Sequence, residues 1–62
     1  MARDLTTLAR NALREAYAVQ TTDEAAKAHA RRALNARGAD EQAASRAVET
    51  AFMRWFHIAG AN

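Results

Sequence analysis

Alanine is the feature that most constrains this chain, because it supplies eighteen of the thirty-one apolar residues in a sequence of 62. Only thirteen larger apolar side chains remain to form a core, and a single core in so short a chain barely outweighs the conformational entropy lost on folding. Cysteine is absent, which excludes disulfides and most zinc sites. We therefore expect one domain, residues 1–62, that depends on close helix packing or on oligomerisation.

The chain contains no proline and only two glycines, Gly38 and Gly60, so we expect helix to dominate. Apolar residues recur at three- and four-residue spacing in three segments, about residues 4–19, 23–37 and 41–59. The short connections between these segments make successive helices antiparallel neighbours. The sequence predicts an all-α fold with three helices in a small antiparallel bundle, which we expect dimerisation to complete.

Each predicted helix begins near a residue that can cap it. A capping side chain accepts a hydrogen bond from a free backbone N–H in the first helical turn. The candidates are Asp4 or Thr6 for the first helix, Thr21 or Thr22 for the second and Asp40 for the third. Gly38 lies between the second and third helices and is the residue type best able to adopt a left-handed terminating conformation.

Motifs of enzyme chemistry are missing from the sequence. It has no glycine-rich phosphate loop, no nucleophile elbow and no HExxH pair, and its one serine, Ser45, falls within the third predicted helix. The two histidines, His29 and His57, are far apart and have no cysteine or second histidine beside them. We expect no catalytic residue, no cofactor and no metal site.

The apolar face of the third predicted helix carries Phe52, Trp55 and Phe56, three of the four aromatic residues. The second helix offers only Leu34 above the size of alanine to cover them, so some apolar surface should stay available to another molecule. We expect a small regulatory or inhibitory protein that binds another protein or a second copy of itself. The three aromatic residues would anchor this contact, and its rim would consist of Met53, Arg54 and His57.

A structural role for the aromatic cluster is the alternative to a binding role. The first helix carries leucines at positions 5, 8 and 13 on its inner face. If these leucines pack against Phe52 and Trp55, the cluster is simply the core of the bundle. The sequence does not decide between the two interpretations.

Basic residues support a second functional hypothesis, nucleic-acid binding. On the first helix Arg3, Arg10 and Arg14 project opposite the leucines, with Tyr17 further along the same side. Lys27 and Arg31 of the second helix would extend this basic face. Acidic residues are interspersed among these cations, so an ordinary solvated surface is the competing interpretation. A helix-turn-helix around Gly38 fits poorly, because the helix after it begins with two carboxylates that would repel phosphates.

The sequence contains no apolar stretch long enough for a membrane span, and Arg3 and Asp4 lie where a signal peptide would need apolar residues. We therefore expect a cytoplasmic protein without a membrane partner. Small chains without catalytic motifs are often encoded by phages and plasmids, which makes such an origin a hypothesis from size alone.

Overall fold

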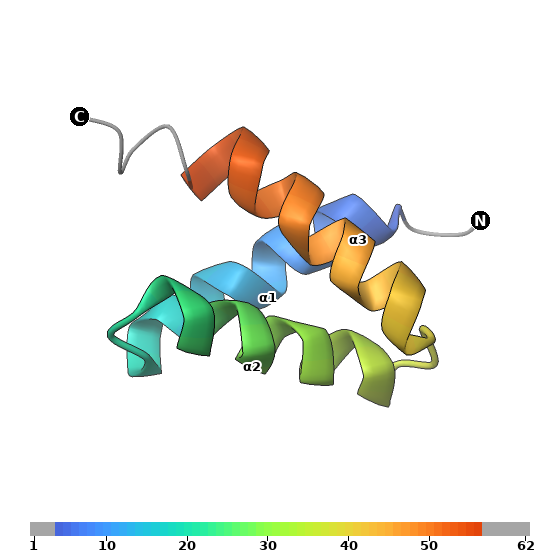
Figure 1. Ribbon diagram of the computed structural model, residues 1–62, viewed down its shortest axis with the longest axis horizontal. Helices are drawn as coiled ribbons and strands as arrows, with labels where there is room; N and C mark the ends of the chain where they lie inside the picture. Colours follow the sequence, from blue (N-terminus) through green and yellow to red (C-terminus); the bar gives the residue numbers. More distant parts are fainter. Residues whose placement is uncertain (1–3, 57–62) are drawn as a thin grey trace.

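A computed structural model describes residues 4–56 of the chain. Three α-helices, α1 (Leu5–Val19), α2 (Asp23–Ala36) and α3 (Glu41–Ala51), are followed by a π-helical turn, η1 (Phe52–Phe56). Helices α1 and α2 are neighbours along one layer, and α3 crosses both of them (Figure 1). The predicted all-α arrangement of three helices is confirmed, and α3 contacts both α1 and α2. Dimerisation stays a prediction.

Side-chain caps fix the beginnings of two helices. The Thr22 hydroxyl accepts a hydrogen bond of 3.1 Å from the backbone N–H of Ala25, and the Asp40 carboxylate accepts one of 2.7 Å from Ala43. Asp4 occupies the N-cap position of α1 without a capping side-chain hydrogen bond. At the other end of α2, Gly38 has a φ of +107°, the left-handed conformation in which a side chain would be strained.

Small side chains make up most of the buried core. Eight of its eleven buried apolar residues are alanines, and the largest fully buried side chains are Leu13, Leu34 and Val48. Each alanine contributes roughly one methyl group of apolar burial, but it lets the helix backbones approach closely. On α2, Ala26, Ala30 and Leu34 are buried, and Ala33 is partly buried against the core. None of the helices within residues 4–56 combines the length and the apolar character that crossing a membrane requires.

The third helix differs from the regular α-helix expected over residues 41–59. It is α-helical only as far as Ala51, and the next five residues form the π-helix η1. A π-helix bonds residue i to residue i+5 and so takes more residues for each turn than an α-helix. Each residue after Ala51 therefore rotates less about the helix axis than it would in an α-helix. As a result Phe56 faces the bundle and Trp55 lies at the side of the third helix. Residues 57–59 of the predicted helix lie outside the described residues.

Candidate protein-binding surface

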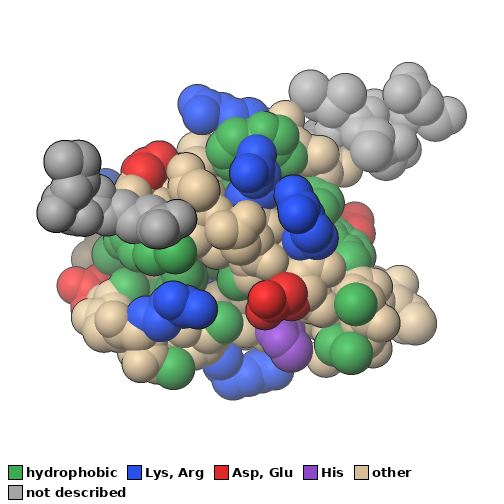
Figure 2. All heavy atoms as spheres, turned by 180° about the vertical axis from the view of Figure 1, so that it is seen from behind, with side chains coloured by type: hydrophobic (Ala, Val, Ile, Leu, Met, Phe, Trp, Pro, Cys, Tyr) green, Lys and Arg blue, Asp and Glu red, His purple; other side chains and the backbone are tan. Residues whose placement is uncertain are grey.

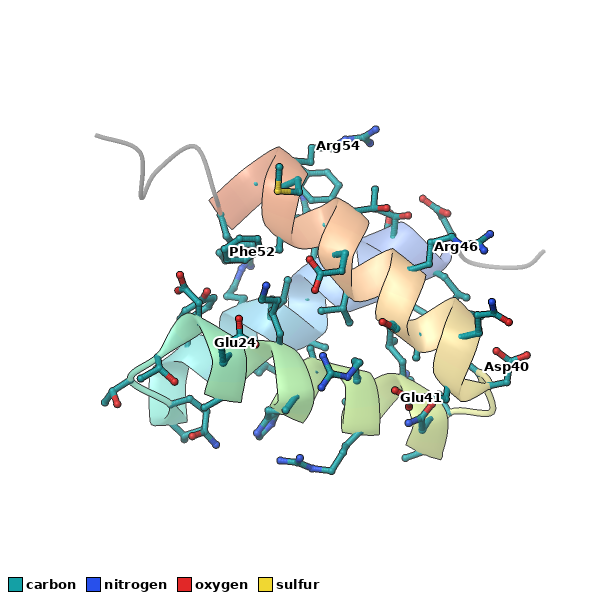
Figure 3. The ribbon with its side chains drawn as sticks, in the orientation of Figure 1. Glu24, Asp40, Glu41, Arg46, Phe52 and Arg54 are labelled. Carbon is teal, nitrogen blue, oxygen red and sulfur yellow. The ribbon has the colours of Figure 1, made fainter. Side chains whose placement is uncertain are left out.

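Two aromatic rings of η1 pack onto the bundle. Phe52, labelled in Figure 3, lies near the beginning of α2, and the Lys27 ammonium is 4.4 Å from the centre of its ring. Phe56 stacks on Tyr17 of α1 with ring centres 5.3 Å apart and planes inclined by 24°. Both phenylalanines are half-buried against the core. These rings attach η1 to the helices, which is the structural role that the sequence left open for the cluster.

The third ring and its neighbour stay at the surface. Met53 is 56% exposed and Trp55 is 36% exposed. Two guanidinium groups lie over the indole ring of Trp55: the Cζ of Arg10 is 5.0 Å and the Cζ of Arg54 is 5.3 Å from the ring centre. Together these four residues (Arg10, Met53, Arg54 and Trp55) form what we call the Trp55 surface. Trp55 is therefore exposed on η1, whereas Phe52 and Phe56 are half-buried against the core.

The two arginines of the Trp55 surface have no acidic partner within residues 4–56, where all the ion pairs involve other cations. In Figure 3 the Arg54 side chain points away from the helices into solvent. The Nε of Arg10 is buried and has no hydrogen-bond acceptor. A guanidinium stacked on a ring keeps its in-plane N–H donors directed outward, so the surface presents an apolar ring and unpaired donors together. Figure 2 shows basic side chains next to hydrophobic ones on the upper part of the rear face.

Cations between α2 and α3 are neutralised within the molecule. The Lys27 ammonium lies 3.4 Å from a carboxylate oxygen of Glu49 and 3.8 Å from one of Glu24, and its side chain is only 12% exposed. The Nε of Arg31 lies 3.6 Å from a carboxylate oxygen of Glu41. These two basic residues were predicted to extend a nucleic-acid-binding face. Their charges are instead used to join α2 to α3.

Arg14, another member of the predicted basic face, lines a depression between α1 and α2; the other lining residues are Leu8, Asn11, Ala12, Glu15, Ala33 and Arg37. Arg3 lies outside the described residues, as does His57 of the predicted protein-binding rim. Of the predicted basic face, Arg10 and Arg14 lie four positions apart on α1, whereas Lys27 and Arg31 are paired with carboxylates.

Tyr17 does not extend a basic outer strip, contrary to the prediction from the helical wheel. Its ring contacts Phe56, and its hydroxyl donates a hydrogen bond of 2.8 Å to the Asp23 carboxylate at the beginning of α2. Burial, with help from this hydrogen bond and from the negative charge of Asp23, raises the pKa of Tyr17 to about 12. Tyr17 thus connects η1 to the turn between α1 and α2.

A shallow groove adjoins the Trp55 surface on the exposed side of the third helix. Its lining residues are Glu49, Thr50, Met53 and Arg54. Helical periodicity indicates this pairing from the sequence, since residues 49 and 53 and residues 50 and 54 are four positions apart. The contact of Arg10 with Trp55 had no such signal, because it depends on how η1 meets α1.

The Trp55 surface can make apolar contacts and donate hydrogen bonds, the chemistry of a binding site for a macromolecule. The described residues contain no group of three or more histidines and carboxylates placed to hold a metal ion. No protein-family model matches the chain, no curated protein matches its sequence, and no solved structure matches its fold.

Proposed function

We propose that this chain is a small regulatory or inhibitory protein that acts without catalysis, by binding another protein through the Trp55 surface. One observation carries the proposal: Met53 and Trp55 remain exposed on η1 while the neighbouring Phe52 and Phe56 pack onto the bundle. Large apolar side chains gathered at one place on a small surface are typical of interaction sites. A protein of this kind would act by occupying or masking its partner's surface.

The composition of the Trp55 surface supports this proposal. Tryptophan, methionine and arginine are enriched at protein interfaces, and tryptophan and arginine carry much of the binding energy there. The surface is also supported from beneath, since Phe52 and Phe56 hold η1 against the helices. A surface held in place before binding loses less conformational entropy when a partner docks.

Nucleic-acid binding receives less support from the charge distribution. Lys27 and Arg31 are engaged with carboxylates, so they offer little net charge to a phosphate backbone. Arg14 lines the depression between α1 and α2, whereas Arg10 and Arg54 lie over Trp55. Homodimerisation through the Trp55 surface remains a prediction, and the experiment that follows reports it separately.

Photo-crosslinking in the native host tests the proposed function. A photoreactive amino acid replaces Met53 in the full chain, and the matched control carries it at Arg32, an exposed position of α2. We expect covalent adducts to another protein from position 53 but not from position 32, and we expect Trp55→Ala to abolish them. Equal labelling from both positions, or labelling that persists without the indole, would reject the proposal. Adducts between two copies of the chain would instead identify a homodimer.

A further inference from the structure

We propose that the partner presents an acidic segment to the Trp55 surface: an apolar side chain packs on Met53 and Trp55, while flanking carboxylates bind Arg10 and Arg54. This inference rests on the function proposed above and specifies the chemistry of the partner. It follows from the charges around the ring, from the unpaired donors and from the residues lining the adjoining groove.

The two arginines are positioned to bind carboxylates. Each guanidinium lies over the Trp55 ring, at 5.0 Å for Arg10 and 5.3 Å for Arg54, which restricts its conformations before any partner arrives. The planar fork of N–H donors on a guanidinium matches the two oxygens of a carboxylate. Within residues 4–56 neither arginine pairs with a carboxylate, whereas Lys27 and Arg31 do.

Arg10 also carries a buried donor, its Nε, that the described residues leave unsatisfied. This N–H group has no acceptor among the described residues, although buried donors in folded proteins are nearly always satisfied. The arginine is therefore held beside Trp55 with hydrogen-bonding capacity unused. The terminal nitrogens of the same guanidinium are the donors that a partner carboxylate can bind.

A second copy of the chain fits this surface less well than an acidic partner. Pairing two Trp55 surfaces about a two-fold axis would bring Arg10 and Arg54 of one copy against the same arginines of the other. Like charges facing each other disfavour such an interface. The carboxylate nearest the groove, that of Glu49, is engaged by Lys27 and so cannot readily neutralise them.

A nucleic acid also fits less well than an acidic protein segment. The groove beside Trp55 contains the thioether of Met53 and the carboxylate of Glu49. Phosphates could pair with the two arginines but would gain nothing from the exposed methionine. An apolar side chain flanked by carboxylates uses both the methionine and the two arginines.

Selection from a displayed library of random peptides tests the chemistry of the partner directly. The full chain is immobilised as the wild type, as the double variant Met53→Ala with Trp55→Ala, and as the double variant Arg10→Gln with Arg54→Gln. Arg32→Gln is the matched control, because Arg32 is an exposed arginine of α2 outside the Trp55 surface. Circular dichroism checks that each variant stays helical. If Arg10→Gln lowers the helicity, the exposed single variant Arg54→Gln takes its place.

We expect the wild type and Arg32→Gln to enrich peptides with Asp or Glu on both sides of an aromatic or aliphatic residue. Replacing those carboxylates by their amides should weaken binding about tenfold, since two exposed ion pairs contribute up to about 1 kcal/mol each and 1.4 kcal/mol is a factor of ten. Replacing Arg10 and Arg54 should weaken binding of the acidic peptide by a similar factor and leave the amide peptide unchanged. Fluorescence anisotropy of labelled peptides measures these ratios.

Three results would overturn the inference. Enrichment of neutral or basic apolar peptides that need Met53 and Trp55 would reject the acidic partner and leave the proposed function standing. If no enriched peptide requires Met53 and Trp55 for binding, both the acidic partner and the proposed function would be rejected. Binding of a single-stranded oligothymidylate that depends on Arg10 and Arg54, in the absence of peptide binding, would assign the surface to nucleic acid.

Discussion

On two flanks of this molecule a cation lies over an aromatic ring. The flanks differ in whether that cation also pairs with a carboxylate. Between α2 and α3, Lys27 lies over Phe52 and also pairs with Glu24 and Glu49. Between α1 and η1, Arg10 lies over Trp55 and meets no carboxylate among residues 4–56. The cation of the first flank is thus paired with carboxylates, and the cation of the second flank is unpaired within the described part of the chain.

The same kind of cation–π contact therefore has two roles in this molecule. On one flank it stabilises the fold, and on the other it leaves a cation that a partner can bind. A cation beside a ring and two carboxylates joins three parts of the chain and has little left to offer a ligand. A cation that contacts a ring but no carboxylate can still offer its charge and its hydrogen-bond donors to a binding partner. The comparison therefore supports the flank at α1 and η1, rather than the basic residues as a group, as the side that we propose binds a partner.

Lys27→Met should give the larger effect on stability, because it removes the paired cation. Methionine keeps the unbranched apolar stem but removes the charge over Phe52, which is worth about 0.5–1 kcal/mol. It also removes two ion pairs worth about 0.2–1 kcal/mol each. We expect the free energy of unfolding to fall by about 1–2 kcal/mol, measured by urea denaturation followed with far-ultraviolet circular dichroism.

Arg10→Met is the matched variant on the other flank. It removes a cation–π contact of similar strength, but it also removes a buried N–H without an acceptor, which costs about 1–3 kcal/mol. We expect the free energy of unfolding to stay constant or to rise by up to about 1 kcal/mol. A greater loss of stability in Arg10→Met than in Lys27→Met would break the comparison, because it would make the flank at α1 and η1 the structural one.

The smallest expected effect concerns the attachment of η1 through Tyr17. Burial and the hydrogen bond to Asp23 raise the pKa of its hydroxyl from 10.0 to about 12, so the neutral phenol is favoured in the folded state. The associated stabilisation is fully present below pH 10 and is lost as the pH rises through about 12. Solvent screening keeps it below about 1 kcal/mol. Thermal melts should show this alkaline loss in the wild type and a smaller one in Tyr17→Phe; equal losses would contradict the account.

The helices and most of their boundaries could be predicted from the sequence because local rules determine them. The lack of proline, the spacing of apolar residues and the caps at Thr22 and Asp40 all act within a few residues of the position they affect. Gly38 ends a helix for an equally local reason, its positive φ. The alanine-rich core follows from composition, since only Leu13, Leu34 and Val48 are both large and fully buried.

The candidate site could be predicted only in part, because its geometry depends on the π-helical turn. An α-helical wheel groups Phe52, Trp55 and Phe56 on one face, whereas the i to i+5 repeat after Ala51 separates them. Met53 and Arg54 were correctly placed beside Trp55 because they are its neighbours in sequence. Arg10 was assigned to a different surface, since its contact with Trp55 joins residues 45 positions apart and no local pattern encodes it.

Trp55 is an exposed ring flanked by two guanidinium groups that pair with no carboxylate within residues 4–56. Because Trp55 is the only tryptophan, quenching of its fluorescence by ions measures that environment directly. We predict that iodide quenches Trp55 more efficiently than caesium, relative to N-acetyltryptophanamide, and that Arg10→Gln with Arg54→Gln removes this preference while Arg32→Gln keeps it. Equal quenching by the two ions, or an indole that neither ion reaches, would contradict the claim.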